Sequence, residues 1–400
     1  MLPLSHLVPA IVEHRDEDIA MRHHLHAHPE LAFEEHATSD WVAARLQAFG
    51  YAVHRGLGGT GVVATLRRGS GTRRLGLRAD MDALPIREET GLAYASATPG
   101  KMHACGHDGH TASLLAAARH LAARGDFDGT LNLIFQPAEE GLGGARRMVR
   151  EGLFEQFPCD AVFAFHNWPG FPAGQFGVLP GTFMSSSDTV RITVHGRGGH
   201  GSMPHLCVDA AVVAAHIVVA LQTVVARNVD PREMAVVTAG YLSAGTISNV
   251  IAQSAQIDLS VRAYSPDVRA LLRERISELV HRQAEAFGAS VTLDYQWRYP
   301  ALQNDAAMTR FARDTIRAAF GEDALIADMR PLTGSEDFSF MLEACPGCYV
   351  IIGNGDGADA CGLHNPHYDF NDDILPIAAS YWVRLTERFL AREQTMPPQD

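Results

Sequence analysis

The stretch Met102-His103-Ala104-Cys105-Gly106-His107-Asp108-Gly109-His110-Thr111 places a cysteine, three histidines and an aspartate within ten residues. The alanine-rich run at 112–123 that follows predicts a helix, so the cluster lies on a loop and the first helical turn. Cys105 and His107 are two residues apart, and a tightly turning loop lets both reach one ion. Thiolate and imidazole are ligands for divalent metals such as zinc. The alternative is a buried cysteine beside solvated histidines, but their density in one loop favours a metal site.

Composition limits the classes of function. The chain has 400 residues, 46% hydrophobic and 20% charged, which suits a globular protein of two domains. Its formal net charge of -13 argues against nucleic acid or an anionic membrane surface as the main partner. We see no signal peptide in residues 1–19, and the apolar run at 208–225 is interrupted by His216 and Gln222, so we expect no membrane-spanning helix. Six irregularly spaced cysteines favour a reducing compartment, and we predict a cytoplasmic protein.

The first part of the chain alternates predicted strands with predicted helices. Two helices are expected within residues 9–50, and short buried strands at 75–78, 131–135 and 161–165. This order predicts an α/β fold, a mixed, mostly parallel sheet covered by helices. Polar residues follow the ends of these strands, at the edge where open α/β sheets place their active sites. These residues include Asp80, Asp82, Glu139, Glu140 and His166.

The pattern changes at about residue 186. Residues 186–299 read as strand, helix, strand, strand, helix, strand, which indicates an inserted ferredoxin-like β-α-β-β-α-β domain. The first pattern resumes near residue 300 and ends with a helix at about 374–390. We therefore expect a discontinuous domain, residues 1–185 and 300–400, on either side of the insert.

The polar residues at the strand ends are numerous enough to hold two divalent ions with a water between them. One carboxylate of the adjacent pair Glu139-Glu140 can bind metal while the other takes a proton from that water, because consecutive side chains diverge. The alternative is a solvated helix start, where acidic residues are favoured. A buried strand and a proline precede the pair, which favours the metal site. The complete set is Asp80, Asp82, Cys105, His107, Glu139, Glu140, His166 and His364.

Five segments resemble one family over the range from His26 to Ile374. The chain is similar to amidohydrolases of the hippurate hydrolase, N-acyl-L-amino acid amidohydrolase and indole-acetyl-amino-acid hydrolase group. That group belongs to the aminoacylase and glutamate-carboxypeptidase type of di-metal peptidases. The resemblance implies a split catalytic domain, a lid and dimerisation domain at 186–299, and hydrolysis of the amide bond of N-acyl amino acids, hippurate-like or N-acetylated. The segments are Cys105-Gly-His-Asp-Gly-His110, Gln136-Pro-Ala-Glu-Glu140, Phe165-His-Asn-Trp-Pro169, Gly198-Gly-His200 and Gly362-Leu-His-Asn-Pro-His367.

The resemblance also implies roles for the residues of the main domain. Glu139 would be the general base that activates water. Two divalent ions, zinc, manganese, cobalt or nickel, would be held by Cys105, His107, Glu140, His166 and His364. Other polar residues would orient these ligands without binding metal themselves. They are Asp80, Asp82, His103, Asp108 and His110.

Three residues of the insert would act on the substrate. The resemblance implies that His200 reaches the active site of the neighbouring subunit and stabilises the oxyanion, so that a homodimer formed through the lid is part of the mechanism. Asn249 would assist it, and Arg262 would grip the substrate carboxylate, a bidentate task that suits a guanidinium. Without the resemblance, Arg262 would be interpreted as a solvent-facing strand residue. Ala252 stands where the family usually has proline, which leaves the shape of the lid loop open.

Alternatives to the N-acyl amino acid amidohydrolase remain open. One is a di-metal dipeptidase or carboxypeptidase that acts on a small peptide. Another is a thiol enzyme with Cys105 as nucleophile, whose activity a chelator would leave intact. A third is a non-catalytic metal-binding dimer, which the presence of Glu139 and of the complete ligand set disfavours. His166 and His364, each taken alone, are equally well explained as core histidines.

Overall fold

The computed structural model describes residues 4–357 and 360–392. Contacts between Cα atoms divide the chain into two compact units. Unit 2 takes up a short segment, Pro331–Glu336, that lies outside the range expected for the insert. Unit 1 comprises Met1–Phe183, Gln303–Arg330 and Asp337–Asp400, and unit 2 comprises Met184–Leu302 and Pro331–Glu336.

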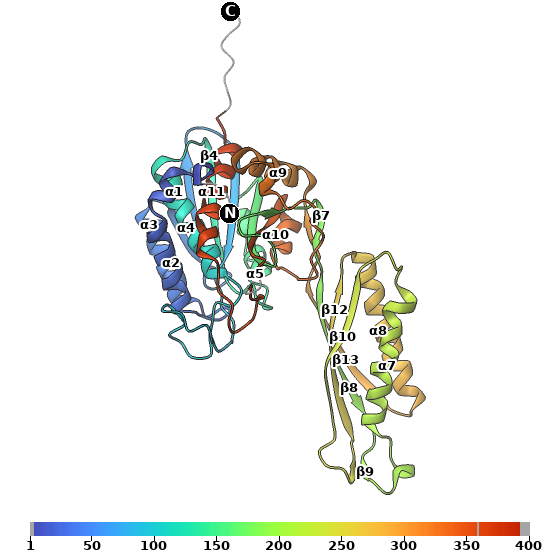
Figure 1. Cartoon of the computed structure of the whole chain (residues 1–400). Coiled ribbons are helices and arrows are strands. Elements are labelled where there is room, and N and C mark those ends of the chain that lie inside the picture. Colours follow the sequence, from blue (N-terminus) through green and yellow to red (C-terminus); the bar gives the residue numbers. More distant parts are fainter. Residues whose placement is uncertain (1–3, 358–359, 393–400) are drawn as a thin grey trace, which may run out of the picture. The chain divides into compact units, whose positions relative to one another are not determined.

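Unit 1 is built on a seven-stranded sheet with the order β1-β2-β4-β3-β5-β15-β6 (Figure 1). The four central strands β4, β3, β5 and β15 run parallel to one another, while β1, β2 and β6 pair antiparallel with their neighbours. This confirms the predicted mixed, mostly parallel sheet. The strands are β1 (Ala52–Leu57), β2 (Gly61–Arg68), β3 (Arg74–Asp80), β4 (Gly129–Gln136), β5 (Ala161–Pro169), β6 (Phe176–Gly177) and β15 (Gly347–Gly355).

The helices of unit 1 pack around this sheet. Where the sequence predicts two helices in residues 9–50, the structure has three, because the backbone leaves the helical conformation at His14 (φ -104°, ψ 13°). The α-helices are α1 (Pro9–Glu13), α2 (Arg15–Ala27), α3 (His36–Ala48), α4 (His107–Arg124), α5 (Gly144–Arg150), α6 (Leu153–Gln156), α9 (Ala306–Phe320), α10 (Ser339–Ala344) and α11 (Leu375–Phe389). Short 3-10 turns lie at η1 (Leu4–His6), η3 (Glu322–Ala324) and η4 (Asp372–Ile374).

Helix α4 is the central helix of this unit. It packs against α2, α11 and β3, and its residues from His107 to Ala118 are buried. Most of the side chains in that stretch are small, so neighbouring helices approach α4 closely from several directions. The tight packing holds the first turn of α4, which carries His107, Asp108 and His110, in one place.

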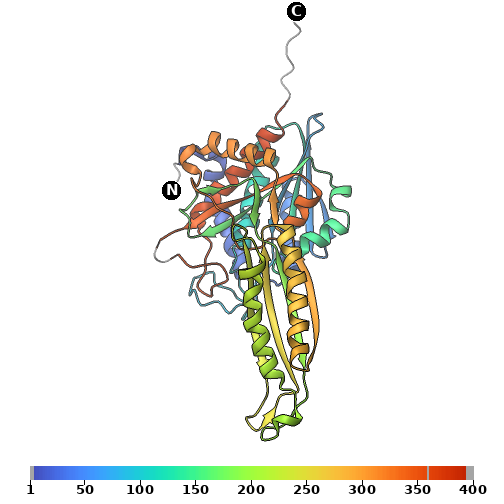
Figure 2. The same cartoon turned by 90° about the vertical axis from the view of Figure 1, so that its right-hand side faces the viewer.

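Unit 2 is an antiparallel sheet of order β10-β12-β8-β13 with two helices. Its chain order is the β-α-β-β-α-β order expected from the sequence, and α7 and α8 lie side by side along the sheet (Figure 2). The elements are β8 (Ser187–His195), α7 (Ala210–Asn228), β10 (Ala235–Ala244), β12 (Ser254–Ala263), α8 (Pro266–Ala286) and β13 (Ser290–Tyr299). Shorter elements of unit 2 are β9 (Gly199–His200), which pairs with β11 (Val250–Ile251), and η2 (Pro204–Leu206). The chain passes between the two units along β7 (Gly181–Met184) and β14 (Leu302–Asn304), which pair with each other.

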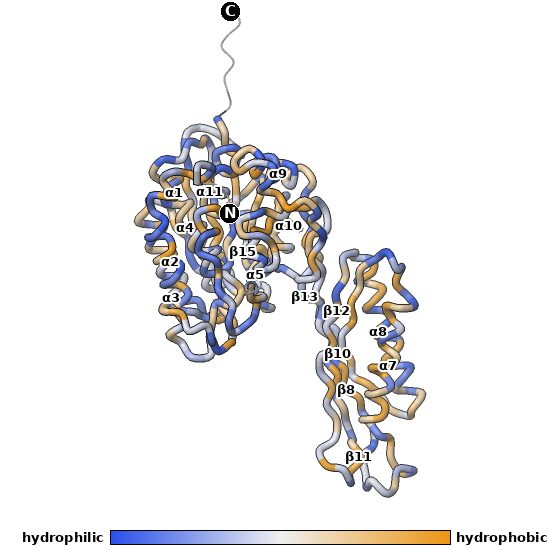
Figure 3. The backbone as a smooth tube through the Cα atoms, viewed as in Figure 1, coloured by the Kyte–Doolittle hydropathy of each residue, from blue (hydrophilic) through white to orange (hydrophobic). Residues whose placement is uncertain are grey.

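Helix α7 is more apolar than the sequence analysis allowed. By length and composition it is the one helix among the described residues that is apolar enough to cross a membrane, because His216 and Gln222 do not offset its many valines and alanines. One face, with Val213, Ile217 and Leu221, is buried in the core of unit 2, and the hydropathy colouring shows how apolar the helix is (Figure 3). A helix in a protein core can have the same length and apolar composition, so this finding alone does not show that α7 crosses a membrane.

Candidate metal centre

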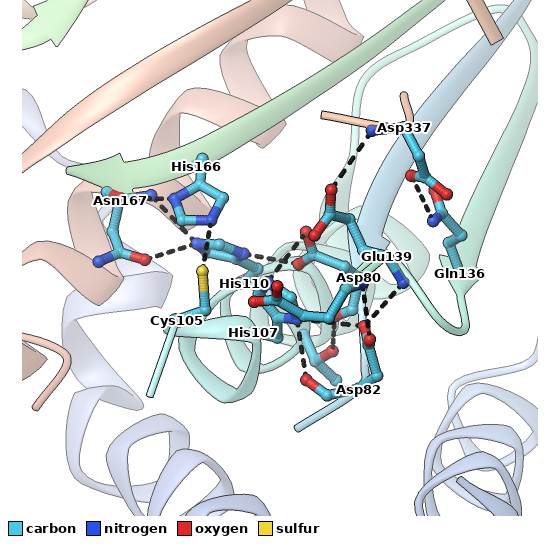
Figure 4. A network of polar contacts seen from close by, with 12 residues as sticks. Asp80, Asp82, Cys105, His107, His110, Gln136, Glu139, His166, Asn167 and Asp337 are labelled. Atoms are coloured by element: carbon cyan, nitrogen blue, oxygen red, sulfur yellow. Dashed lines mark hydrogen bonds and ion pairs between the residues drawn. The ribbon is translucent and has the colours of Figure 1, made fainter. Parts of the chain in front are cut away.

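The strand ends of unit 1 bring the predicted polar residues together. Strands β3 and β4 pair in parallel with Asp80 beside Gln136, and β5 and β15 pair with His166 beside Ile351. Because the strands are parallel, the residues after Asp80 and Gln136 emerge at the same edge. The loop before α4 reaches this edge as well, and Figure 4 shows the resulting cluster.

The Cys105 loop is shaped by Gly106. This residue precedes α4 with a left-handed backbone (φ 94°), and a Cβ there would lie 2.1 Å from Oδ1 of Asn167, so only glycine fits. The turn directs the Sγ of Cys105 to within 3.2 Å of Nε2 of His166 (Figure 4). Nδ1 of His166 lies 2.6 Å from the carbonyl oxygen of Asn167 and donates to it, so the lone pair of the ring is on Nε2.

His107 supplies the clearest indication of a cation site. Its Nδ1 donates to the carbonyl oxygen of Asp82 at 2.8 Å, so in the neutral ring the lone pair lies on Nε2. Nε2 is buried and has no hydrogen-bond partner among the described residues; Oδ2 of Asp80 lies 3.6 Å away. A buried polar atom without a partner is costly, and a metal ion would satisfy this one.

Asp82 holds the pair Glu139-Glu140 in place. Its two carboxylate oxygens accept the backbone N–H of Glu139 at 3.1 Å and that of Glu140 at 3.0 Å. The residue before the pair, Ala138, has a left-handed backbone (φ 54°), which is strained for a side chain other than glycine. Buried Asp82 therefore helps to set the direction in which both glutamate side chains leave the backbone. The sequence analysis expects Asp82 to orient metal ligands in this way.

His364 joins the cluster from the C-terminal part of unit 1. Its backbone is also left-handed (φ 63°), and its N–H donates to the carbonyl oxygen of Ala104 at 2.7 Å, which ties its loop to the Cys105 loop. Its Nε2 lies 3.0 Å from Oε1 of Glu140. Strained backbone persists only where the surroundings enforce it, and it is frequent at functional sites.

Taken together, the five predicted ligands lie in one cluster. In unit 1 three sets of side chains have potential ligand atoms within 4.8 Å of one another: Cys105, Glu140 and His364; His107, Glu139 and Glu140; Asp80, His107, His110 and His166. In the third set, Asp80 and His110 are already engaged. Asp80 accepts a hydrogen bond from Nδ1 of His110 at 2.6 Å and another from Arg78 at 2.8 Å. Asp80 and His110 are therefore already bonded to other side chains of the cluster region.

The electrostatics of the cluster favour a bound cation. Burial raises the pKa of the Cys105 thiol well above its usual range, and the carboxylates of Glu140 and Glu139 raise it further. Burial alone would lower the pKa of His107, but Asp80 and Asp82 raise it to about 10. Burial acts on the two pKa values in opposite directions, and the neighbouring carboxylates raise both of them. A thiolate, imidazoles and carboxylates there are a donor set that suits divalent metals.

Asp108 faces away from the cluster. One of its oxygens accepts from Arg22 and from Nδ1 of His26, both at 2.8 Å, so it anchors the start of α4 to α2. Beside it, the ring nitrogens of His103 are buried and have no hydrogen-bond partner among the described residues, and burial lowers the pKa of this histidine to about 4. Neither residue is among the side chains whose potential ligand atoms lie within 4.8 Å of one another, and their supporting role stays a prediction.

The sequence interpretation missed Asp337. Its backbone N–H donates to Oε1 of Glu139 at 3.3 Å, and its carboxylate accepts from the side chain of Gln136 at 2.7 Å and from the N–H of Ala145 at 2.8 Å (Figure 4). It therefore links the end of β4, the start of α5 and Glu139. The only signal was the pair Glu336-Asp337 in a short loop, to which the local pattern assigns no role.

In unit 2 the three predicted residues lie in two places. His200 in β9 pairs with Val250 of β11, and the carbonyl oxygen of Asn249 accepts the N–H of Gly201 at 2.8 Å, so His200 and Asn249 are neighbours at the start of β12. Arg262 lies near the other end of β12, where its guanidinium donates to the carbonyl oxygen of Thr333 at 3.2 Å. Within one copy of unit 2, the length of β12 therefore separates Arg262 from the other two residues.

The family follows from comparison with known proteins. The model of peptidase family M20/M25/M40 matches residues 76–388. The chain belongs to this family. It is 44% identical over 384 residues to hippurate hydrolase of Campylobacter jejuni, which covers 96% of this chain and 99% of the relative. It is 36% identical over 366 residues to N-acetyl-L-cysteine deacetylase of Bacillus subtilis, covering 91% of this chain and 86% of the relative.

A solved structure agrees with the fold. A Bacillus subtilis protein described as a dinuclear metal-binding peptidase of the M20 family superposes with a TM-score of 0.80 at 31% identity. The match covers 95% of this chain and 99% of that protein. The amidohydrolase resemblance inferred from the five segments is thereby confirmed, and the divalent metals expected from the cluster agree with it.

Proposed function

We propose that this protein hydrolyses the amide bond of N-acyl amino acids and releases a carboxylic acid and an amino acid. The observation that carries the proposal is the cluster itself, in which Glu139 adjoins a set of thiol, imidazole and carboxylate side chains suited to divalent metals. Membership of the M20 family and 44% identity to a hippurate hydrolase support an amide substrate of this kind.

We assign the ligands of two divalent ions to Cys105, His107, Glu140, His166 and His364, as the family resemblance implies. The orphaned Nε2 of His107 and the approach of Cys105 to His166 support this assignment. When bound, such ions polarise the scissile carbonyl and lower the pKa of water. Zinc, manganese, cobalt and nickel all accept these donors, and metal content after expression would decide among them.

Glu139 moves the proton in the proposed reaction. Its carboxylate takes a proton from the attacking water while the oxygen bonds to the acyl carbon. It then delivers the proton to the amide nitrogen as the carbon–nitrogen bond breaks. Asp82 and Asp337 orient it through hydrogen bonds to its backbone N–H and its carboxylate, so the base is held before substrate binds.

His200 stabilises the oxyanion of the tetrahedral intermediate in this proposal. Its Nδ1 accepts the backbone N–H of Ser202 at 3.2 Å, so the neutral ring carries its proton on Nε2 and has a donor free for an oxyanion. We propose that residues 186–299 form a lid and dimerisation domain through which His200 serves the neighbouring subunit, and that residues 1–185 and 300–400 form the catalytic domain. Asn249 would assist His200, and Arg262 would bind the substrate carboxylate. A cytoplasmic location completes the proposal.

The competing functions make different predictions. A thiol enzyme requires a thiol of low pKa, whereas burial and two carboxylates raise the pKa of Cys105, which disfavours this alternative. A dipeptidase shares the metal centre and differs only in its substrate.

The decisive experiment measures amino-acid release by the metal-loaded protein from hippurate, N-acetyl amino acids and dipeptides, with and without a chelator. Release from the N-acyl substrates that the chelator abolishes and added metal restores is the expected result. Release only from dipeptides would replace the proposal with the dipeptidase. Release that survives the chelator would contradict the metal mechanism.

A further inference from the structure

The turn after β4 presents a large hydrophobic side chain to solvent. Leu142 is 49% exposed, whereas the other exposed large hydrophobic side chains among the described residues belong to unit 2. Leu142 belongs neither to the large core of unit 1 nor to the small cluster formed by Met102, Ala104 and Tyr368. The side chain therefore adds to neither of these two cores.

The backbone of this turn is held by hydrogen bonds that do not involve the leucine side chain. The N–H of Gly141 donates to the carbonyl oxygen of Glu139 at 2.7 Å, and that of Gly144 donates to Ala138 at 2.9 Å. Gly141 and Gly143, on either side of Leu142, have left-handed backbones with φ of 80° and 74°, which glycine adopts freely. These two hydrogen bonds and the two positive φ angles define the turn that carries the leucine.

That position adjoins the metal cluster. Leu142 follows two residues after Glu140, a proposed ligand, and three after Glu139, the proposed base. On β5 the ring of Trp168 meets the ring of His166 edge-on, with ring centroids 5.7 Å apart. Two of the segments that supply the cluster thus carry a large apolar side chain next to a proposed ligand, and Leu142 is the more exposed of the two.

We propose that Leu142 is a specificity-determining residue that packs against an apolar acyl group of the substrate. This inference rests on the proposed function. In an N-acyl glycine such as hippurate the amino acid has no side chain, so the acyl group is the only apolar part that a leucine can contact. Covering Leu142 and the acyl group together removes both from water, which favours aromatic or branched acyl groups over acetyl.

The test compares kcat/KM for hippurate, N-acetylglycine and N-acetylphenylalanine in the wild type, Leu142→Ala and Leu142→Met. Leu142→Ala should lower kcat/KM for hippurate by about tenfold more than for N-acetylglycine, and Leu142→Met should restore most of the loss. N-acetylphenylalanine should follow N-acetylglycine, because its apolar group lies on the amino-acid side of the bond. Val219→Ala, which truncates an exposed apolar side chain of unit 2, should leave the ratio of the two glycine substrates unchanged.

Each outcome separates this inference from the proposed function. If the wild type hydrolyses none of the substrates, the proposed function fails. If the wild type is active and sensitive to chelator but Leu142→Ala lowers all three values equally, only the role of Leu142 is overturned. A loss confined to N-acetylphenylalanine would also overturn it, because Leu142 would then contact the amino-acid side chain instead.

Discussion

Glu139 and His200, the two residues proposed to move charge and protons, are supported in different ways. Glu139 is 7% exposed, with its backbone N–H bound to Asp82 and its carboxylate bound to the N–H of Asp337. His200 lies in a two-residue strand, is exposed, and its ring contacts the hydroxyl of Ser202 at 2.8 Å. Unit 1 therefore prepares its catalytic group in advance, whereas an exposed histidine becomes an effective donor only when water is excluded around it.

The backbone around Glu139 also differs from the backbone around His200. The described residues other than glycine with left-handed backbones are Phe33, Ala138 and His364, all in unit 1, and two of them lie at the metal cluster. The hairpin of His200 instead uses glycines where segments approach closely; a Cβ on Gly201 would lie 3.0 Å from the carbonyl oxygen of Asn249. Strain of about 1–3 kcal/mol per residue is held by the packed core of unit 1. The comparison teaches that strained backbone lies beside the proposed ligands and the proposed base, whereas the hairpin of the proposed oxyanion donor is built from glycines.

The strongest test of this comparison is Glu139→Gln. The amide keeps the size of the side chain but cannot accept a proton from water, so we expect kcat to fall by about 10³-fold while metal content stays near that of the wild type. Steady-state hydrolysis of hippurate and elemental analysis measure the two quantities. Wild-type turnover in this variant would remove Glu139 from the mechanism, and loss of metal would make it a ligand instead.

His200→Ala should have the next largest effect, a fall in kcat of roughly 10²–10³-fold with no loss of metal, because one oxyanion donor is removed. The variant also tests the proposed exchange between subunits. Mixing His200→Ala with Glu139→Gln and allowing subunits to exchange should restore activity that neither variant has alone. If the mixture stays inactive although mixed dimers form, His200 acts within its own subunit or not at all.

The buried network under α4 predicts a dependence of stability on pH. Burial alone would lower the pKa of His26, but its hydrogen bonds to Asp108 and Glu88 raise it to about 9. The stabilisation is complete below pH 6.5, the pKa of an unfolded histidine, and is lost as the pH rises through 9; it amounts to about 3 kcal/mol. Denaturant unfolding of the metal-loaded protein at pH 6 and pH 10 should show this decrease, and His26→Gln should remove most of it. An equal decrease in His26→Gln would assign the effect to another group.

Asp82→Asn is expected to have the smallest effect of the four. An amide keeps one oxygen to accept a backbone N–H but loses the second acceptor, so Glu139 and Glu140 cannot both be held. We expect metal affinity to fall by about 10- to 100-fold, and activity to recover when metal is added in excess. Metal titration followed by an activity assay provides both values. An unchanged affinity would show that the strained turn at Ala138 holds the glutamates without Asp82.

Much of the fold was predictable because it is encoded in short stretches. The alternation of apolar strands, polar loops and helices in residues 75–165 predicts a mostly parallel sheet, and the sheet was confirmed. The order of elements in unit 2 could be derived in the same way. The break at His14 could not, because the residues on both sides of it favour a helix, and the apolarity of α7 was underestimated by giving weight to two polar residues.

Of the candidate site, the residue types and their location at the strand ends were predictable, and the individual tasks were not. Asp80, Asp82 and Asp108 are alike in sequence, each close to a cluster of polar residues. Their hydrogen bonds separate them, since Asp80 binds Arg78 and His110, Asp82 binds the backbone of the glutamate turn, and Asp108 binds α2. Those partners come from other segments of the chain, which no local pattern contains.

The sequence by itself determined which chemical groups are available and at which edge of a parallel sheet they emerge, because strand periodicity and the direction of parallel strands are local and repetitive. Only the tertiary structure decided that Asp337, 198 residues away along the chain, binds Glu139, that Nε2 of His107 has no hydrogen-bond partner among the described residues, and that Leu142 is exposed beside the cluster. These features depend on how distant segments pack, and packing is a property of the whole fold.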